Sequence, residues 1–239
     1  MARTVKPEEY AQKRNQIVEV AMQRMMFKGF HNLAIREILD EIHISSGAFH
    51  HYFESRDALL DAILERIMQI SEKELLPLTH DPHLSAMQKL TGFFTTLDRI
   101  RVDRKEDVAR LNRVWFADEN ANVRKKMDEA VLAHRAPLLN QIVRQGVQEG
   151  VFTTEHPEHS GEVILSLLNG MGSAHIRLLN QAIQEQDEAC IGEIADEIID
   201  VYRAFMTAVE RVLGAPADSL GQIDTGLARL WVNTVREIR

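Results

Sequence analysis

The feature that most constrains this 239-residue chain is the spacing of its apolar residues, which recur every three or four positions along almost the whole sequence. That spacing places them on one face of a helix, whereas a half-buried strand would alternate apolar and polar residues. The nearest approach to an alternating stretch, residues 150–154, is too short to form a significant strand. The sequence therefore predicts an all-α fold.

Start and stop signals divide the chain into ten predicted helices. Pro7 suits a first helical position, and Gly29 suits the residue that follows a helix end. Asn32 and Ser55 are candidate N-caps, and the run from Ser85 to Gln88 has the pattern of a capping box. The expected helices span about 7–28, 33–42, 45–52 and 55–67, and, beyond a break at 77–82, about 85–104, 107–117, 122–149, 157–183, 188–213 and 219–239.

Two of these helices are short: the first spans 33–42, and the second begins at Ser45 or Ser46 and reaches Tyr52. They are joined by His43, Ile44 and Ser45. A helix-turn-helix motif has this spacing: one helix lies against the DNA backbone and the next enters the major groove. One such motif reads few base pairs, so useful affinity requires two copies about 34–36 Å apart. The pattern indicates a dimer that binds double-stranded DNA at a roughly palindromic operator.

The run from Ala34 to Ile38 and the run from Ile44 to Leu59 resemble the DNA-binding motif of TetR-family regulators. The resemblance implies an N-terminal three-helix headpiece, residues 1–56, followed by a larger helical domain, residues 57–239, for effector binding and dimerisation. It implies a repressor released from its operator by a small molecule. A ligand-independent interaction protein with a degenerate headpiece is the alternative. The individual matching positions are Ile17, Ala21, Gly29 and Phe30 upstream of these runs, and Ser45, Gly47, Phe49, Tyr52, Phe53, Ser55 and Leu59 within the second run.

Short side chains at the start of the second short helix would let it approach base edges, while longer ones reach phosphates or bases. Phe49 and Phe53 are expected in the core, and Tyr52 either sends its hydroxyl to a phosphate or is a partly buried aromatic residue. Arg3 and Lys6 are further phosphate candidates in the tail. The expected DNA-binding residues are Arg36, Ser45, Ser46, Gly47, Ala48, His50, His51, Tyr52 and Arg56.

The formal net charge of −8 is unevenly distributed. Residues 1–56 hold 8 Lys/Arg and 7 Asp/Glu, so the acidic excess lies entirely in residues 57–239. Ser46, Ala48 and His50 replace residue types more usual in the resembling family, and the second short helix has no Lys or Arg. Since histidines gain charge near neutral pH, we expect DNA affinity to rise as pH falls from 8 toward 6.

The helices at about 157–183 and 188–213 carry apolar faces that the resemblance would pair across a two-fold axis as a homodimer. Gly170 in the first of them indicates a close approach, either by the partner's backbone or by another helix of the same subunit. Polar groups on apolar faces can orient a ligand, although aromatic residues and Met are also ordinary core fillers. The candidate effector residues are Phe93, Phe94, Trp115, Phe116, His134, Met171 and His175.

Several functional classes are not indicated. No apolar run is long enough for a membrane span, and the N-terminus lacks the apolar stretch of a secretory signal, so we expect a cytoplasmic protein. The single cysteine, Cys190, cannot form an intramolecular disulfide. No catalytic constellation or cofactor motif is found, and Pro157 breaks the zinc-like spacing of residues 155–159, so no metal is expected. The helix at 219–239 either packs back on the body or extends the dimer interface.

Overall fold

The computed structural model describes residues 7–115, 118–220 and 224–238, and this part of the chain contains helices and no strand. The all-α prediction is confirmed. The helices are α1 (Pro7–Lys28), α2 (Ile35–Glu41), α3 (Ser46–Tyr52), α4 (Arg56–His80), α5 (Ala86–Asp103), α6 (Lys105–Trp115), the 3-10 turn η1 (Asp118–Asn120), α7 (Ala121–Gln148), α8 (Ser160–Gln184), α9 (Glu188–Leu213) and α10 (Thr225–Glu237).

Several helix ends have the capping residues expected from the sequence. The Ser85 hydroxyl accepts from the backbone N–H of Gln88, whose side chain in turn accepts from the N–H of Ser85, completing the capping box of α5. The hydroxyl of Ser55 accepts from the backbone of Ala58 in the first turn of α4. Gly29 has a φ of +77°, the left-handed conformation expected just after α1.

Asn32 is an exception, because it does not cap the following helix. Helix α2 starts two residues later than expected, at Ile35, and its N-cap is Ala34, which has no side-chain acceptor. The Asn32 side chain instead donates to the carbonyl of Lys28 at the end of α1. It therefore stabilises the C-terminal end of the helix before it.

The break between helices starts later than the sequence predicted, at residue 81 and not at residue 77. Helix α4 continues through Pro77 as far as His80, and only residues 81–85 separate it from α5. Proline removes one N–H donor from the helix interior, so this segment loses a backbone hydrogen bond. Packing holds the turn nevertheless: Leu75 and Thr79 are fully buried, and the Thr79 hydroxyl donates to the Leu75 carbonyl at 2.8 Å.

The chain forms two compact units, which we call the headpiece unit (Met1–Gln69 with Arg110–Ala130) and the body unit (Ile70–Ala109 with Val131–Arg239). The headpiece unit buries one face of each short helix and one face of α1. Its fully or nearly fully buried side chains include Ile17, Ala21, Met25, Leu33, Ile38, Leu39, Phe49, Phe53, Leu59, Leu60 and Ile63. These are the positions at which the helical periodicity places apolar residues.

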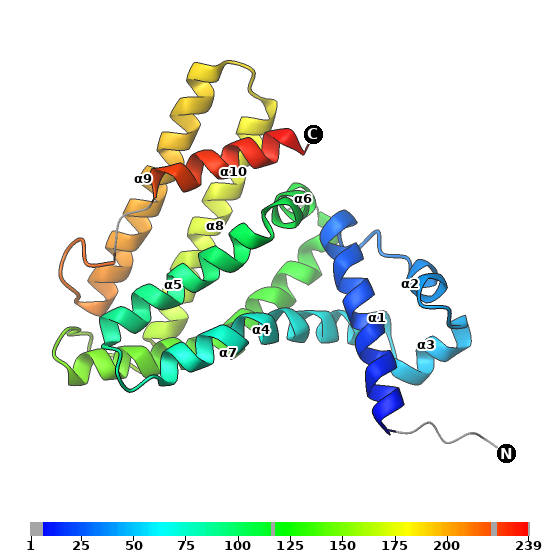
Figure 1. The fold of residues 1–239 in the computed structure, drawn as a ribbon. Helices are drawn as coiled ribbons and strands as arrows, with labels where there is room; N and C mark the ends of the chain where they lie inside the picture. The colour runs from blue at the N-terminus through cyan, green and yellow to red at the C-terminus, as the bar shows by residue number, and fades with distance from the viewer. Residues whose placement is uncertain (1–6, 116–117, 221–223, 239) are drawn as a thin grey trace. The chain divides into compact units, whose positions relative to one another are not determined.

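In the body unit, α8 and α9 pack along each other, and α10 lies against both (Figure 1). A Cβ added to Gly170 would lie 3.3 Å from the Phe205 ring of α9, so the close approach at this glycine is an internal helix contact. Ala228, Val232 and Val235 of α10 join the buried cluster formed with α8 and α9. Of the two roles considered for the C-terminal helix, packing back on the body is therefore the observed one.

Candidate functional site

The turn between α2 and α3 is closed by backbone hydrogen bonds at the end of α2. His43 has a φ of +56°, and its N–H donates to the Asp40 carbonyl at 3.3 Å. The N–H of Ile44 donates to the Leu39 carbonyl at 3.0 Å. This pair of bonds is the Schellman motif, in which glycine usually occupies the left-handed position. The turn thus adopts the geometry that a helix-turn-helix needs, with His43 at the left-handed position that strains a residue with a Cβ.

Helix α3 is anchored by aromatic residues on one side and exposed on the other. Phe49 and Phe53 are buried, and their rings stack with centroids 5.8 Å apart. On the other side Gly47, His50 and His51 are exposed, and Ala48 is half-buried. Because the anchoring residues do not use the outward positions, α3 can present those positions to a ligand as large as a DNA duplex.

The first turns of α1 hold the C-terminal ends of both short helices. The Tyr10 hydroxyl donates to the His51 carbonyl at 3.1 Å, and the Lys13 ammonium donates to the Ile42 carbonyl at 3.1 Å. The Arg14 guanidinium lies 4.8 Å from the centre of the Phe53 ring. Positions 10, 13 and 14 share one face of a helix. We call these three residues the α1 brace; their helical spacing is visible in the sequence, which alone does not reveal their partners.

Farther along α1, two cations bind the acidic face of α2. Arg24 forms ion pairs with Glu37 at 2.8 Å and Glu41 at 2.6 Å, and Lys28 also pairs with Glu37. The hydrogen bond from Lys28 lowers the pKa of the Glu37 carboxyl, and the bond to Glu41 raises the pKa of Arg24. These pairs neutralise carboxylates that would otherwise repel a polyanion near α2.

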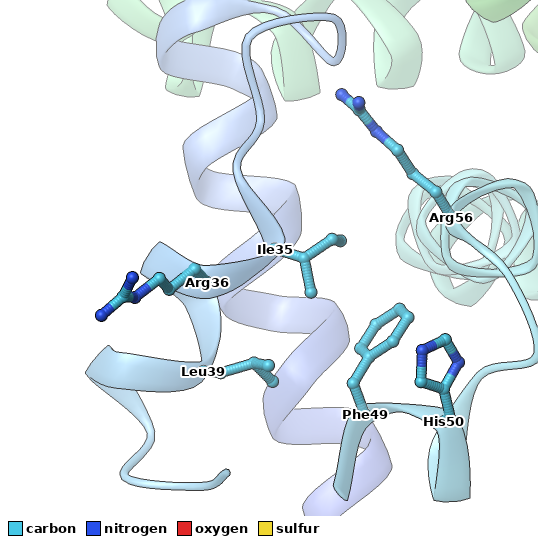
Figure 2. Close-up of a pocket in the computed structure, with 6 residues that line it drawn as sticks. All are labelled: Ile35, Arg36, Leu39, Phe49, His50 and Arg56. Atoms are coloured by element: carbon cyan, nitrogen blue, oxygen red, sulfur yellow. The ribbon is translucent and has the colours of Figure 1, made fainter. Parts of the chain in front are cut away.

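A mostly apolar groove separates α2 from α3 in the headpiece unit. Figure 2 shows the side chains that line it: Ile35, Arg36, Leu39, Phe49, His50 and Arg56. The Arg36 side chain points away from the groove and is 86% exposed, with a long 3.8 Å pair to Asp40. A phosphate contact by Arg36 stays a prediction.

Arg56 has partners within the protein. Its Nη2 donates to the carbonyls of Phe30 and His31, and its guanidinium lies 4.8 Å from the centre of the Phe30 ring. This arrangement supports the loop that follows α1. A DNA contact by Arg56 stays a prediction, and it would use the other guanidinium nitrogens.

Of the remaining predicted contact residues, the structure describes some and not others. Ser45 is exposed at the N-cap of α3, but its hydroxyl makes no capping bond. Tyr52 is half-buried, with its ring stacked 5.0 Å from that of Tyr10. The side chain of Ser46 and the tail residues 1–6 lie outside the described parts.

Residues 17–63 match the family model for bacterial regulatory proteins of the tetR family. Through these residues the chain is similar to regulators of the TetR family. A curated relative, the HTH-type transcriptional regulator PksA of Bacillus subtilis, is 27% identical over 134 residues. That alignment covers 53% of this chain and 58% of PksA, so the chain spans little more than half the length of this relative.

Two solved structures are similar over almost the whole chain. RolR in complex with resorcinol is 17% identical, covers 93% of this chain and 96% of its own, and has a TM-score of 0.59. A TetR-family regulator from Pectobacterium atrosepticum is 13% identical and also has a TM-score of 0.59. Its alignment covers 89% of this chain and 100% of the regulator's chain. At these identities the likeness concerns the fold, which agrees with the predicted helix-turn-helix headpiece and larger helical domain.

The candidate effector residues do not all belong to one unit. Phe93, Phe94 and Met171 are buried in the main core cluster of the body unit. Trp115 ends α6 in the headpiece unit, and Phe116 lies outside the described residues. Their role in effector binding stays a prediction.

The two candidate histidines both lie in the body unit and have polar partners. His134 Nδ1 lies 2.6 Å from a Glu72 carboxylate oxygen, and His175 Nε2 lies 3.1 Å from the Ile198 carbonyl. Burial lowers the pKa of His175, although its hydrogen bond to Ile198 acts the other way.

Within the described residues, no group of three His, Cys, Asp or Glu side chains is arranged to hold a metal ion, and no helix is long and apolar enough to cross a membrane. His156 and Glu158 of the zinc-like segment approach only to 3.9 Å, and both side chains are exposed.

Proposed function

We propose that this chain is a sequence-specific DNA-binding transcriptional regulator. The observation that carries the proposal is the exposed side of α3, with Gly47, His50 and His51, on a helix whose end is held by the α1 brace. In this proposal residues 1–56 read DNA in the cytoplasm, residues 57–239 dimerise and bind an effector, and the chain performs no catalysis.

DNA recognition is tested by selection from randomised duplexes, followed by gel-shift measurements on the selected site. A Cβ added to Gly47 would meet no atom within 4 Å, so Gly47→Glu leaves the fold unstrained while placing a carboxylate at the groove. We expect at least about 100-fold weaker binding, which corresponds to roughly 3 kcal/mol. Ala121→Glu, at an exposed alanine of the same unit, is the matched control and should bind within a few-fold of the wild type.

Enrichment of a roughly palindromic site, lost in Gly47→Glu and kept in Ala121→Glu, would support the regulator. A folded wild-type protein that enriches no sequence even at low salt would refute it and favour the interaction protein with a degenerate headpiece. The absence of Lys and Arg from α3 is the observation behind that alternative.

The exposed histidines of α3 give the DNA complex an expected pH dependence. Histidine side chains gain positive charge between pH 8 and 6, which strengthens phosphate contacts. Wild-type affinity should rise over this interval, and the His50→Gln/His51→Gln double variant should show a flatter profile. If affinity changed equally with pH in the two proteins, the histidines would not contribute to the DNA interface.

A homodimer formed through α8 and α9 is the proposed assembly. It is supported by the need for two recognition helices and by Val163, a valine of α8 that is 44% exposed. Val163→Glu should shift the mass measured by light scattering from dimer to monomer. Val147→Glu, on an α7 valine that is 37% exposed, is the control; dissociation by both variants or by neither would contradict this interface.

Release of DNA by a small molecule is the proposed regulation, and repression is the expected outcome. The support is the similarity in fold to RolR, whose structure contains resorcinol. An effector would act by binding the conformation that fits DNA less well, with a typical coupling of about 1–3 kcal/mol.

A further inference from the structure

Arg135 of α7 is a largely buried cation with too few partners. Its Nη2 donates to the Ser71 hydroxyl at 3.3 Å, and its Nε is buried with no hydrogen-bond partner. A guanidinium carries five N–H donors, and a buried charge ordinarily meets an opposite charge. Within the described residues no carboxylate forms an ion pair with Arg135, so its charge has no direct partner in this state.

The two charged groups that act on Arg135, Glu72 and Arg101, have other partners. Glu72 binds His134 at 2.6 Å, and Arg101 pairs with Asp98 at 3.3 Å. Burial first, and then the like charge of Arg101, lower the pKa of Arg135 to about 10, while Glu72 acts in the opposite sense. Arg135 therefore remains charged at neutral pH, with a second arginine near enough to repel it.

Apolar side chains also lie beside this charge on α7. Val131, Leu138 and Leu139 lie four residues before, three after and four after Arg135, and so share its side of α7. All three belong to or pack against the main core cluster, which also contains Phe94 and Met171. All the residues of this argument lie in the body unit. A molecule that neutralised Arg135 would extend its remaining atoms along this apolar surface.

We propose that Arg135 anchors a binding site for a small organic carboxylate with an apolar body. The planar guanidinium presents parallel N–H donors that match the two oxygens of a carboxylate, and its Nε has no competing acceptor. The inference rests on the proposed function in one respect: it makes this carboxylate the chemical class of the effector. Because Nε is shielded here, the ligand enters by displacing a neighbouring side chain, so the bound conformation differs from this one.

The test is thermal unfolding of the full-length protein with benzoate, phenylacetate or hexanoate, each compared with its neutral amide. At tenfold excess over Kd, at least one acid should raise Tm by about 3–6 °C more than its amide. Arg135→Met should lose this acid-specific rise, and Arg135→Lys, which keeps the charge without the fork, should retain only part of it. Arg99→Met, at a half-exposed arginine of α5, is the control and should respond like the wild type.

A second readout needs no ligand. Removal of a buried cation that has no ion-pair partner should raise the Tm of ligand-free Arg135→Met above that of the wild type, whereas removal of a stabilising structural arginine would lower it. The proposal is overturned if no acid exceeds its amide in the wild type, if Arg135→Met keeps the acid response, or if ligand-free Arg135→Met melts below the wild type. The DNA selection on the same protein is an independent test. Its failure would refute the proposed regulator function but would not refute the carboxylate site.

Discussion

Replacement of His43 by glycine should stabilise the headpiece unit. His43 holds a φ of +56° in the Schellman turn, and a left-handed backbone costs a residue with a Cβ about 1–2 kcal/mol. Glycine avoids that cost but loses about 0.4–1 kcal/mol through the greater freedom of its unfolded chain. The exposed imidazole has no hydrogen bond among the described residues, so little else is lost. The net expectation is a gain of about 0.5–1 kcal/mol.

The two tryptophans make this gain measurable, because Trp115 lies in the headpiece unit and Trp231 in the body unit. In a Trp231→Phe background, Trp115 fluorescence reports urea unfolding of the headpiece unit alone. The midpoint for His43→Gly should rise by about 0.3–1 M. His43→Ala keeps the Cβ and should stay within about 0.5 kcal/mol of the parent. An equal rise for alanine, or none for glycine, would refute the left-handed strain argument.

Three further substitutions test other contacts, each followed by the tryptophan of the unit concerned. Tyr10→Phe removes the donor to the His51 carbonyl but keeps the ring, and should cost about 0.5–1.5 kcal/mol; no loss would show that the brace acts through stacking alone. Asn140→Ala leaves two backbone groups at the start of α8 without their partner and should lower the free energy of unfolding by about 2–3 kcal/mol. The same substitution at an exposed asparagine should lower it by less than about 1 kcal/mol. Because the pKa of His175 is lowered in the folded protein, the unfolded chain binds a proton at a higher pH, and the stability of the body unit should fall as pH drops below about 6.5. His175→Gln should make this fall less steep. An unchanged slope would show that His175 is not the group responsible.

Features set by neighbouring residues in the sequence could be predicted well. The capping box at Ser85, the cap at Ser55 and the glycine after α1 all lie where local pattern places them. These signals act over three or four residues, so they do not depend on the rest of the fold. The anchoring role of Phe49 and Phe53 follows in the same way from the apolar periodicity of the headpiece.

Features set by distant residues could not be predicted. Tyr10 and His51 are 41 positions apart, and Arg135 and Ser71 are 64 apart, so no local pattern indicates either contact. The continuation of α4 through Pro77 is also a tertiary effect, since burial of that turn outweighs the lost backbone bond. Sequence thus predicts the helix-turn-helix, but the brace and the buried arginine require the fold.

The two sides of α3 also bear on how this chain can evolve. Phe49 and Phe53 carry its packing, while Gly47, His50 and His51 are exposed. Exposed substitutions usually change stability by less than about 0.5 kcal/mol. Under the proposed function, single substitutions at these three positions alter the preferred operator at little cost to folding. Homologues that share this headpiece can therefore control different genes, and an operator found for one does not transfer to the next.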